Sequence, residues 1–77
     1  MKTISGRNYY NETDFKTMCV ALDAGERIEV YIDCIGHSTN NVEQENYRQA
    51  IVAKYGDKVE VMQGGSPLSY NYSYKLR

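Results

Sequence analysis

The chain has 77 residues, which is enough for a single compact domain spanning 1–77. Nine basic and ten acidic side chains leave a formal net charge of −1. This balance argues against a protein whose main task is to coat phosphate backbones, because such proteins carry a basic surplus. Leu, Ile, Val and Phe together number only 15, whereas there are eight tyrosines and no tryptophan. Tyrosine must therefore supply much of the core.

The first half of the chain predicts a strand, a helix and a second strand. Lys2–Ser5 is a short strand candidate. A helix follows, capped by Asn11 or Thr13 and ended by Gly25, which is free to adopt the left-handed conformation. Its apolar stripe at i, i+3, i+4 and i+7 consists of Phe15, Met18, Cys19 and Leu22. Arg27–Ile35 then alternates apolar and polar residues, which indicates a strand with one face against helices.

The second half predicts a helix and a hairpin. Asn41 with Gln44 three residues later resembles a capping box, and Gly56 ends the helix as Gly25 ends the first one. The rest of the chain is predicted as the strand Val59–Met62, the turn Gln63–Pro67, and a strand of period two, Leu68–Leu76.

The element order βαβαββ predicts an α+β two-layer sandwich, with two helices packed on one face of a mixed three- to four-stranded sheet. Only three strands remain if Lys2–Ser5 is not one of them. Each β-α-β step permits parallel pairing with a right-handed crossover, and the last two strands form an antiparallel hairpin. The last strand is a candidate open edge, so the chain is expected to be a monomer or a homodimer.

The sequence also carries signals about cellular compartment. The first seven residues have no apolar segment of the kind found in signal peptides, and no apolar run is long enough to span a bilayer. Cys19 and Cys34 both fall in apolar patterns, so we expect two reduced, buried thiols in a cytoplasmic protein without a membrane partner. A Cys19–Cys34 disulfide is the alternative.

The residues that carry catalytic chemistry are few. Cys34 and His37 are three residues apart, but Cys34 shares its strand parity with core positions. Glu43 and Glu45 lack a recognisable partner base. A structural zinc takes four ligands, and Cys19, Cys34 and His37 supply three. We expect no enzyme activity, no metal site and no cofactor.

A polar loop between the central strand and the second helix is a candidate anion-binding site. It enters a helix N-terminus, where free backbone N–H groups favour anions. The lysine and glycines of the common phosphate-binding motifs are missing, so an ordinary capping loop is the preferred interpretation. The candidate donors are His37, Ser38, Thr39, Asn40 and Asn41.

The tyrosines divide into two groups. One group follows apolar periodicities and is predicted to pack toward the helices: Tyr47, Tyr55, Tyr70, Tyr72 and Tyr74. If the last three faced solvent instead, they would form a platform for stacking single-stranded bases. The other group falls at polar positions and, with two acidic residues, is the candidate protein-binding surface: Tyr9, Tyr10, Tyr31, Glu29 and Asp33.

These observations favour a small non-catalytic binding protein that occludes a surface on a larger protein. In size and composition the chain is similar to the small inhibitors that bacteriophages encode against host defence or host regulation, including inhibitors of CRISPR nucleases; no motif carries this likeness. The first alternative is a single-stranded nucleic-acid-binding module that uses the tyrosine-rich sheet. The second is a nucleotide or small-ligand binder that uses the His37–Asn41 loop.

Overall fold

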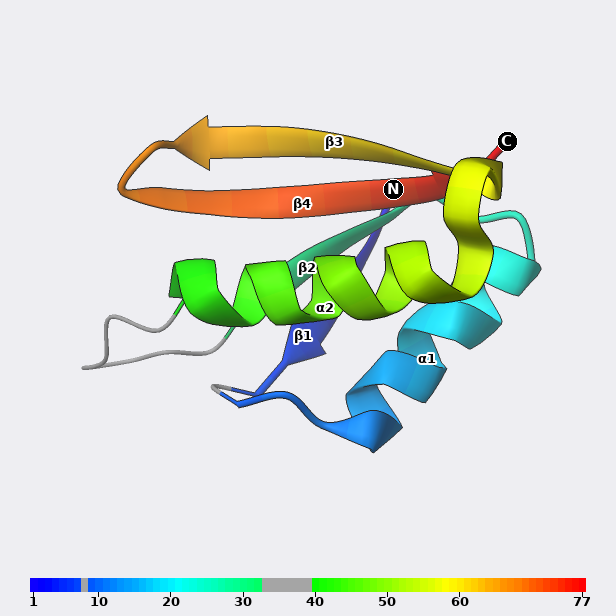
Figure 1. Ribbon diagram of the computed structural model, residues 1–77, viewed down its shortest axis with the longest axis horizontal. Helices are drawn as coiled ribbons and strands as arrows, with labels where there is room; N and C mark the ends of the chain where they lie inside the picture. The colour runs from blue at the N-terminus through cyan, green and yellow to red at the C-terminus, as the bar shows by residue number, and fades with distance from the viewer. Residues whose placement is uncertain (8, 33–39) are drawn as a thin grey trace.

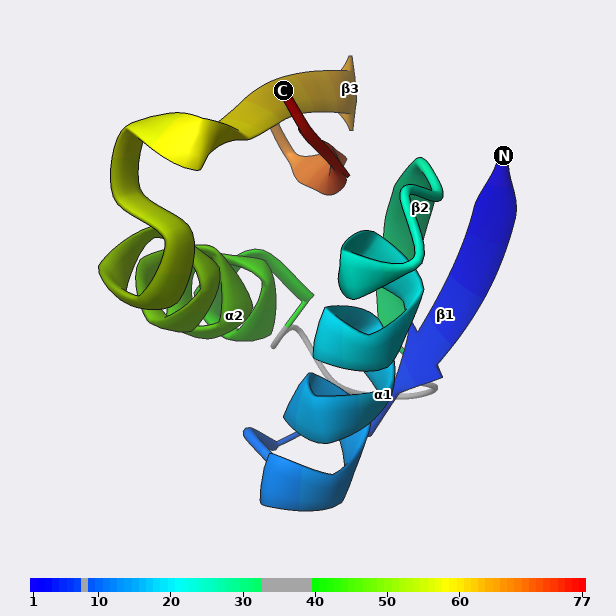
Figure 2. The ribbon, with the colours of Figure 1, turned by 90° about the vertical axis from the view of Figure 1, so that its right-hand side faces the viewer.

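The computed structural model describes residues 1–7, 9–32 and 40–77. The predicted order βαβαββ is confirmed, and two helices with a mixed four-stranded sheet form the expected small α+β sandwich (Figure 1). The elements are β1 (Lys2–Gly6), α1 (Glu12–Asp23), β2 (Ile28–Ile32), α2 (Asn40–Tyr55), the 3-10 turn η1 (Gly56–Lys58), β3 (Val59–Ser66) and β4 (Ser69–Leu76). Figure 2 shows that α1 and α2 lie on the same side of the sheet.

The sheet has the strand order β1-β2-β4-β3. β1 runs parallel to β2, with Ile4 opposite Val30, and β4 runs antiparallel to both of its neighbours. The outer strands are therefore β1 and β3, at opposite ends of the sheet in Figure 2. The expectation that the last strand forms an open edge is wrong, because β2 and β3 flank it on both sides.

The pairing of β4 is uneven. Toward β3 it forms eight register pairs, from Val59 opposite Leu76 to Ser66 opposite Ser69. Toward β2 the described residues form only two, Ile28 with Tyr74 and Glu29 with Ser73. The outer half of the β3–β4 hairpin therefore leaves the sheet as a two-stranded ribbon, as Figure 1 shows.

The hairpin is longer and its turn tighter than predicted. The expected turn over Gln63–Pro67 is wrong, because β3 continues to Ser66 and only Pro67 and Leu68 form the turn. Gly65 has a φ of 90°, and a Cβ there would lie 2.8 Å from the carbonyl oxygen of Ser69. A glycine lets the strand continue through this position, where a side chain would collide with the opposite backbone.

The first helix begins and ends as predicted. The side-chain oxygen of Asn11 accepts hydrogen bonds from the backbone N–H groups of Thr13 and Asp14, at 2.9 and 3.2 Å. Gly25 and Gly56 follow the two helices with φ values of 83° and 58°. Both are left-handed conformations that an L side chain adopts only with strain.

The second helix departs from prediction at its start. The structure has α2 begin at Asn40, so Asn41 already lies inside the helix. The expected capping box of Asn41 and Gln44 is wrong, because both side chains hydrogen-bond to strands of the sheet. Of the predicted strand Arg27–Ile35, residues 28–32 are strand, and residues 33–35 lie outside the described residues.

The core lies between the helices and the sheet. Met18 and Leu22 of α1 and Tyr47 and Ile51 of α2 are excluded from solvent, as are their sheet neighbours Ile28, Val30 and Tyr74. Cys19 is also buried with a free thiol, whereas Cys34 lies outside the described residues. Within the described ranges, no helix is both long enough and apolar enough to cross a membrane.

Candidate functional site

The sheet face opposite the helices is the candidate functional site. Helices cover the other face, so alternate residues of every strand are left without a covering layer here (Figure 2). We call this surface the open face; its side chains are Thr3, Ser5, Glu29, Tyr31, Glu60, Met62, Asn71, Ser73 and Lys75.

One row of side chains crosses the whole open face. Thr3 of β1 is the register partner of Glu29, which is also the partner of Ser73, and Ser73 is in turn the partner of Met62. Met62 is 52% exposed, and so is Tyr31, two residues beyond Glu29 on β2. The open face therefore presents two large, partly apolar side chains among polar and charged ones.

A hollow of about 320 Å³ opens where β4 separates from β2. This volume is at the lower end of the range for ligand pockets. Glu29 and Met62 are its charged and apolar lining residues, and the two lining glycines add no side-chain bulk. The lining residues are Glu29, Met62, Gln63, Gly64, Gly65, Asn71 and Ser73.

The two carboxylates of the open face differ in their partners. Glu60 accepts from the Nη2 atom of Arg27 at 3.4 Å, and the Nη1 atom of the same arginine lies 3.3 Å from the Met62 sulfur. Glu29 is half-buried and forms no ion pair with any residue that the structure describes. The hollow is thus lined by a glutamate that forms no ion pair within the described part of the chain.

Gln44 of α2 closes the gap between β2 and β4 from the helix side. Its amide nitrogen donates to the carbonyl of Val30 at 2.7 Å, and its amide oxygen accepts from the backbone N–H of Tyr72 at 3.1 Å. The same nitrogen lies 3.3 Å from the side-chain oxygen of Asn71, which lines the hollow. A buried side chain on the helix therefore fixes the separation of the strands beside the hollow.

The first turn of α2 bonds to the ribbon in the same way. Asn40 donates to the carbonyl of Tyr70 at 2.8 Å, and the side-chain oxygen of Asn41 accepts from the N–H of that residue at 3.2 Å. Two of the five candidate anion donors are thus engaged with β4. The other three, His37, Ser38 and Thr39, lie outside the described residues.

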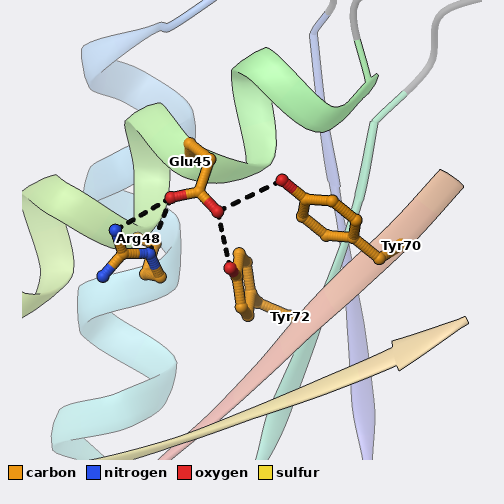
Figure 3. A network of polar contacts seen from close by, with 4 residues as sticks. All are labelled: Glu45, Arg48, Tyr70 and Tyr72. Carbon is orange, nitrogen blue, oxygen red and sulfur yellow. Dashed lines mark hydrogen bonds and ion pairs between the residues drawn. The ribbon is translucent and has the colours of Figure 1, made fainter. Parts of the chain in front are cut away.

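The tyrosines of β4 face the helices, as predicted. The hydroxyls of Tyr70 and Tyr72 donate to one oxygen of Glu45 at 3.2 and 2.5 Å, and Arg48 binds the other oxygen at 2.8 Å (Figure 3). The hydrogen bond from Tyr72 and the adjacent Arg48 lower the pKa of Glu45 below its usual value. These rings lie between α2 and β4, so they do not form a stacking platform for bases on the open face.

Two further tyrosines lie in the core with different partners. The Tyr47 hydroxyl donates to the carbonyl of Tyr9 at 3.4 Å and accepts from the N–H of Asn11 at 3.1 Å. Burial raises the pKa of Tyr47 to about 12. The Tyr74 hydroxyl is fully buried and has no hydrogen-bond partner among the described residues, and burial raises its pKa as well.

The structure brings together only part of the predicted binding surface. Tyr31 and Glu29 are neighbours on the open face, whereas Asp33 lies outside the described residues. Tyr9 is 53% exposed in the segment before α1, where Arg7 donates to its hydroxyl at 3.4 Å.

Tyr10 is not the exposed residue that its polar context suggested. Its ring is half-buried against Phe15 and Tyr47, with ring centroids 6.2 and 5.1 Å away. Tyr10 thus packs against one ring from α1 and one ring from α2, and the local sequence does not reveal the contact with α2. Tyr10 is therefore less exposed than its polar context suggested.

Sequence reasoning missed other residues of the site. Met62, Asn71 and Ser73 were not among the predicted binding residues, although the period-two pattern of the hairpin assigns them to the polar side. That parity was a usable signal for the open face. The hollow itself had no such signal, because it depends on the separation of β2 from β4.

Across residues 1–7, 9–32 and 40–77, no group of three or more His, Cys, Asp or Glu side chains is positioned to hold a metal ion. The fold and the site together define a small α+β protein with tyrosines in its core and one uncovered sheet face. Its sequence matches no protein-family model, and the searches of curated proteins and of solved structures found no match either.

Proposed function

We propose that this protein is a non-catalytic binding protein whose open face covers a surface on a larger protein. One observation carries the proposal: an uncovered sheet face presents two half-exposed side chains, Tyr31 and Met62, next to a hollow. Tyrosine and methionine are enriched in protein interfaces, and small polar neighbours let a partner approach the sheet closely.

Electrostatics favour a protein over a nucleic acid as the partner. Glu29 and Glu60 are balanced by Lys75 on the same face and by Arg27, which is bound to Glu60. The open face therefore lacks the basic surplus with which proteins bind phosphate backbones. The form of the proposal that size and composition favour is an inhibitor of the bacteriophage type, directed against a host defence system such as a CRISPR nuclease or against a host regulator, in the cytoplasm. The identity of the captured partner tests this narrower form.

The experiment is site-specific photo-crosslinking in the cells in which the protein is naturally made. Benzoylphenylalanine replaces Tyr31 on the open face in one sample and Val20, which is 70% exposed on α1, in the control. The proposal expects a protein adduct at position 31 that survives nuclease treatment and is absent at position 20. Adducts at both positions, at neither, or only with nucleic acid would overturn it.

A quantitative measurement with the purified partner follows. Tyr31→Ala is expected to weaken binding by about tenfold or more, because interface tyrosines are frequent hot spots. Val20→Ala is the matched control, since it shortens an exposed apolar side chain on the other layer. Equal effects of the two substitutions would exclude the open face as the interface.

A further inference from the structure

We infer that the hollow on the open face receives an arginine side chain of the partner protein, with Glu29 as its counter-charge. The inference rests on the proposed function and specifies the chemistry of the partner. It draws on the lining of the hollow, on its charge and on the Tyr31 side chain of the same face.

The charge is the first argument. Glu29 is half-buried in a hollow of about 320 Å³ and has no ion-pair partner among the described residues. Glu60, the other carboxylate of this face, is bound to Arg27 at 3.4 Å. A partner that covers the open face without a cation would bury Glu29 unpaired, which is costly. A basic side chain removes that cost.

The walls of the hollow are the second argument. Met62 offers an apolar, polarisable surface to the methylene stem of a long side chain, and the Ser73 hydroxyl beside Glu29 can accept a further N–H. Gly64 and Gly65, on the same strand as Met62, also line the hollow and add no side-chain bulk. A long cation with several donors therefore fits these walls better than a compact one.

Tyr31 is the third argument, and it favours arginine over lysine. Its half-exposed side chain lies on the same face as Glu29, two residues along β2. A planar guanidinium can stack on an aromatic ring while it forms two parallel hydrogen bonds to a carboxylate, which an ammonium group does not do.

The test uses an arginine probe and does not need the partner. The labelled protein is titrated with the capped tripeptide acetyl-Gly-Arg-Gly-amide, and backbone amide shifts are followed by NMR. We expect saturable shifts centred on Glu29, Ser73 and Gly64, weakened by added salt. The tripeptide with citrulline, which has the same shape but no charge, should bind about three- to tenfold more weakly, and the lysine tripeptide should fall between them.

The variants make the titration specific. Glu29→Gln should reduce arginine binding by about three- to tenfold, whereas Asp57→Asn, which removes an exposed carboxylate of η1, should leave it unchanged. Tyr31→Leu should remove the preference for arginine over lysine. A resolved amide spectrum for each variant verifies its fold. Equal binding of citrulline, an unchanged Glu29→Gln, or shifts elsewhere on the chain would overturn the inference.

The two proposals fail in different ways. Capture of a partner at position 31, combined with an arginine probe that does not saturate, would leave the proposed function intact and exclude the arginine. Saturable arginine binding at Glu29 without any adduct at position 31 would exclude the proposed function and leave a basic-side-chain site.

Discussion

Gln44 bonds to the backbone of Val30 in the position that a strand neighbour would otherwise occupy. Its amide nitrogen donates to that carbonyl at 2.7 Å, and its amide oxygen accepts from Tyr72 on the strand opposite at 3.1 Å. A single side chain from the helix layer thus supplies both halves of a strand-to-strand contact, at the point where the register of β2 and β4 stops.

Replacement of Gln44 by methionine tests this contact. Gln44→Met keeps the length of the side chain but leaves the Val30 carbonyl and the Tyr72 N–H without their partner. We expect the free energy of unfolding to fall by about 2–4 kcal/mol, measured by urea denaturation. The amide of Tyr72 should also exchange faster with deuterium. Gln49→Met on the exposed side of α2 is the control and should change stability little.

Loss of the hydroxyl should lower the free energy of unfolding at Tyr47 and raise it at Tyr74. Tyr47→Phe removes hydrogen bonds to Tyr9 and Asn11 and should cost about 1–2 kcal/mol. Tyr74→Phe removes a buried hydroxyl that has no described partner and should raise stability by about 1 kcal/mol. Thermal and urea denaturation of the two variants measure these changes. A loss of stability in Tyr74→Phe would show that the Tyr74 hydroxyl has a hydrogen-bond partner.

The carboxylate of Glu45 gives the stability a dependence on acid pH. Its pKa in the folded state lies below its ordinary value of 4.5. The contribution of Glu45 to stability is therefore present above pH 4.5 and is lost as the pH falls through the lowered pKa. Tyr72→Phe should raise this pKa more than Tyr70→Phe, because the Tyr72 hydrogen bond is the larger cause. Carbon NMR of the side-chain carboxyl measures both shifts, and equal shifts would contradict the assignment.

Tyr47 should make the stability of the fold fall at alkaline pH. Because its pKa rises from 10.0 to about 12 on folding, its contribution is complete below pH 10 and is lost as the pH rises toward 12. The phenolate absorbance of the folded protein should therefore lack one tyrosine step in Tyr47→Phe near the upper end of that range. An unaltered titration curve would exclude the assignment.

Alanine substitutions at two glycines with positive φ compare backbone strain alone with strain plus a steric clash. Gly25 has open space around its Cβ position, so Gly25→Ala should cost only the backbone strain of about 1–2 kcal/mol. Gly65→Ala adds a clash at 2.8 Å with the Ser69 carbonyl and should cost more. Urea melts compare the two, and a smaller loss for Gly65→Ala would show that the ribbon adapts to the side chain.

Sequence-based predictions were confirmed where the spacing of residues within one helix or strand determines its structure. The stripe of α1, the Asn11 cap and the inward tyrosines of β4 all follow from local spacing, and the structure confirms them. The prediction was wrong in the hairpin because two adjacent glycines, Gly64 and Gly65, are typical of a turn. In the structure they pair with Asn71 and Tyr70 and so belong to a strand.

The candidate site was predictable only in part. The alternation of β2 assigned Tyr31 and Glu29 to the polar face, and they are neighbours there. Tyr10 was misjudged because its burial depends on Tyr47, which is 37 positions away in the sequence. The hollow depends on Gln44, whose spacing from Asn41 indicated a helix cap instead.

The separation of β2 from β4 also bears on how this fold can change over evolutionary time. Beyond the pairs at Ile28 and Glu29, the described residues of β2 share no further register pair with the hairpin that would fix how far it extends. Residue pairs added at Pro67 and Leu68 would lengthen the ribbon without shifting the two register pairs that β2 and β4 share. The length of the hairpin can thus vary independently of the core, and descendants of this chain can differ in that length while they retain the same core.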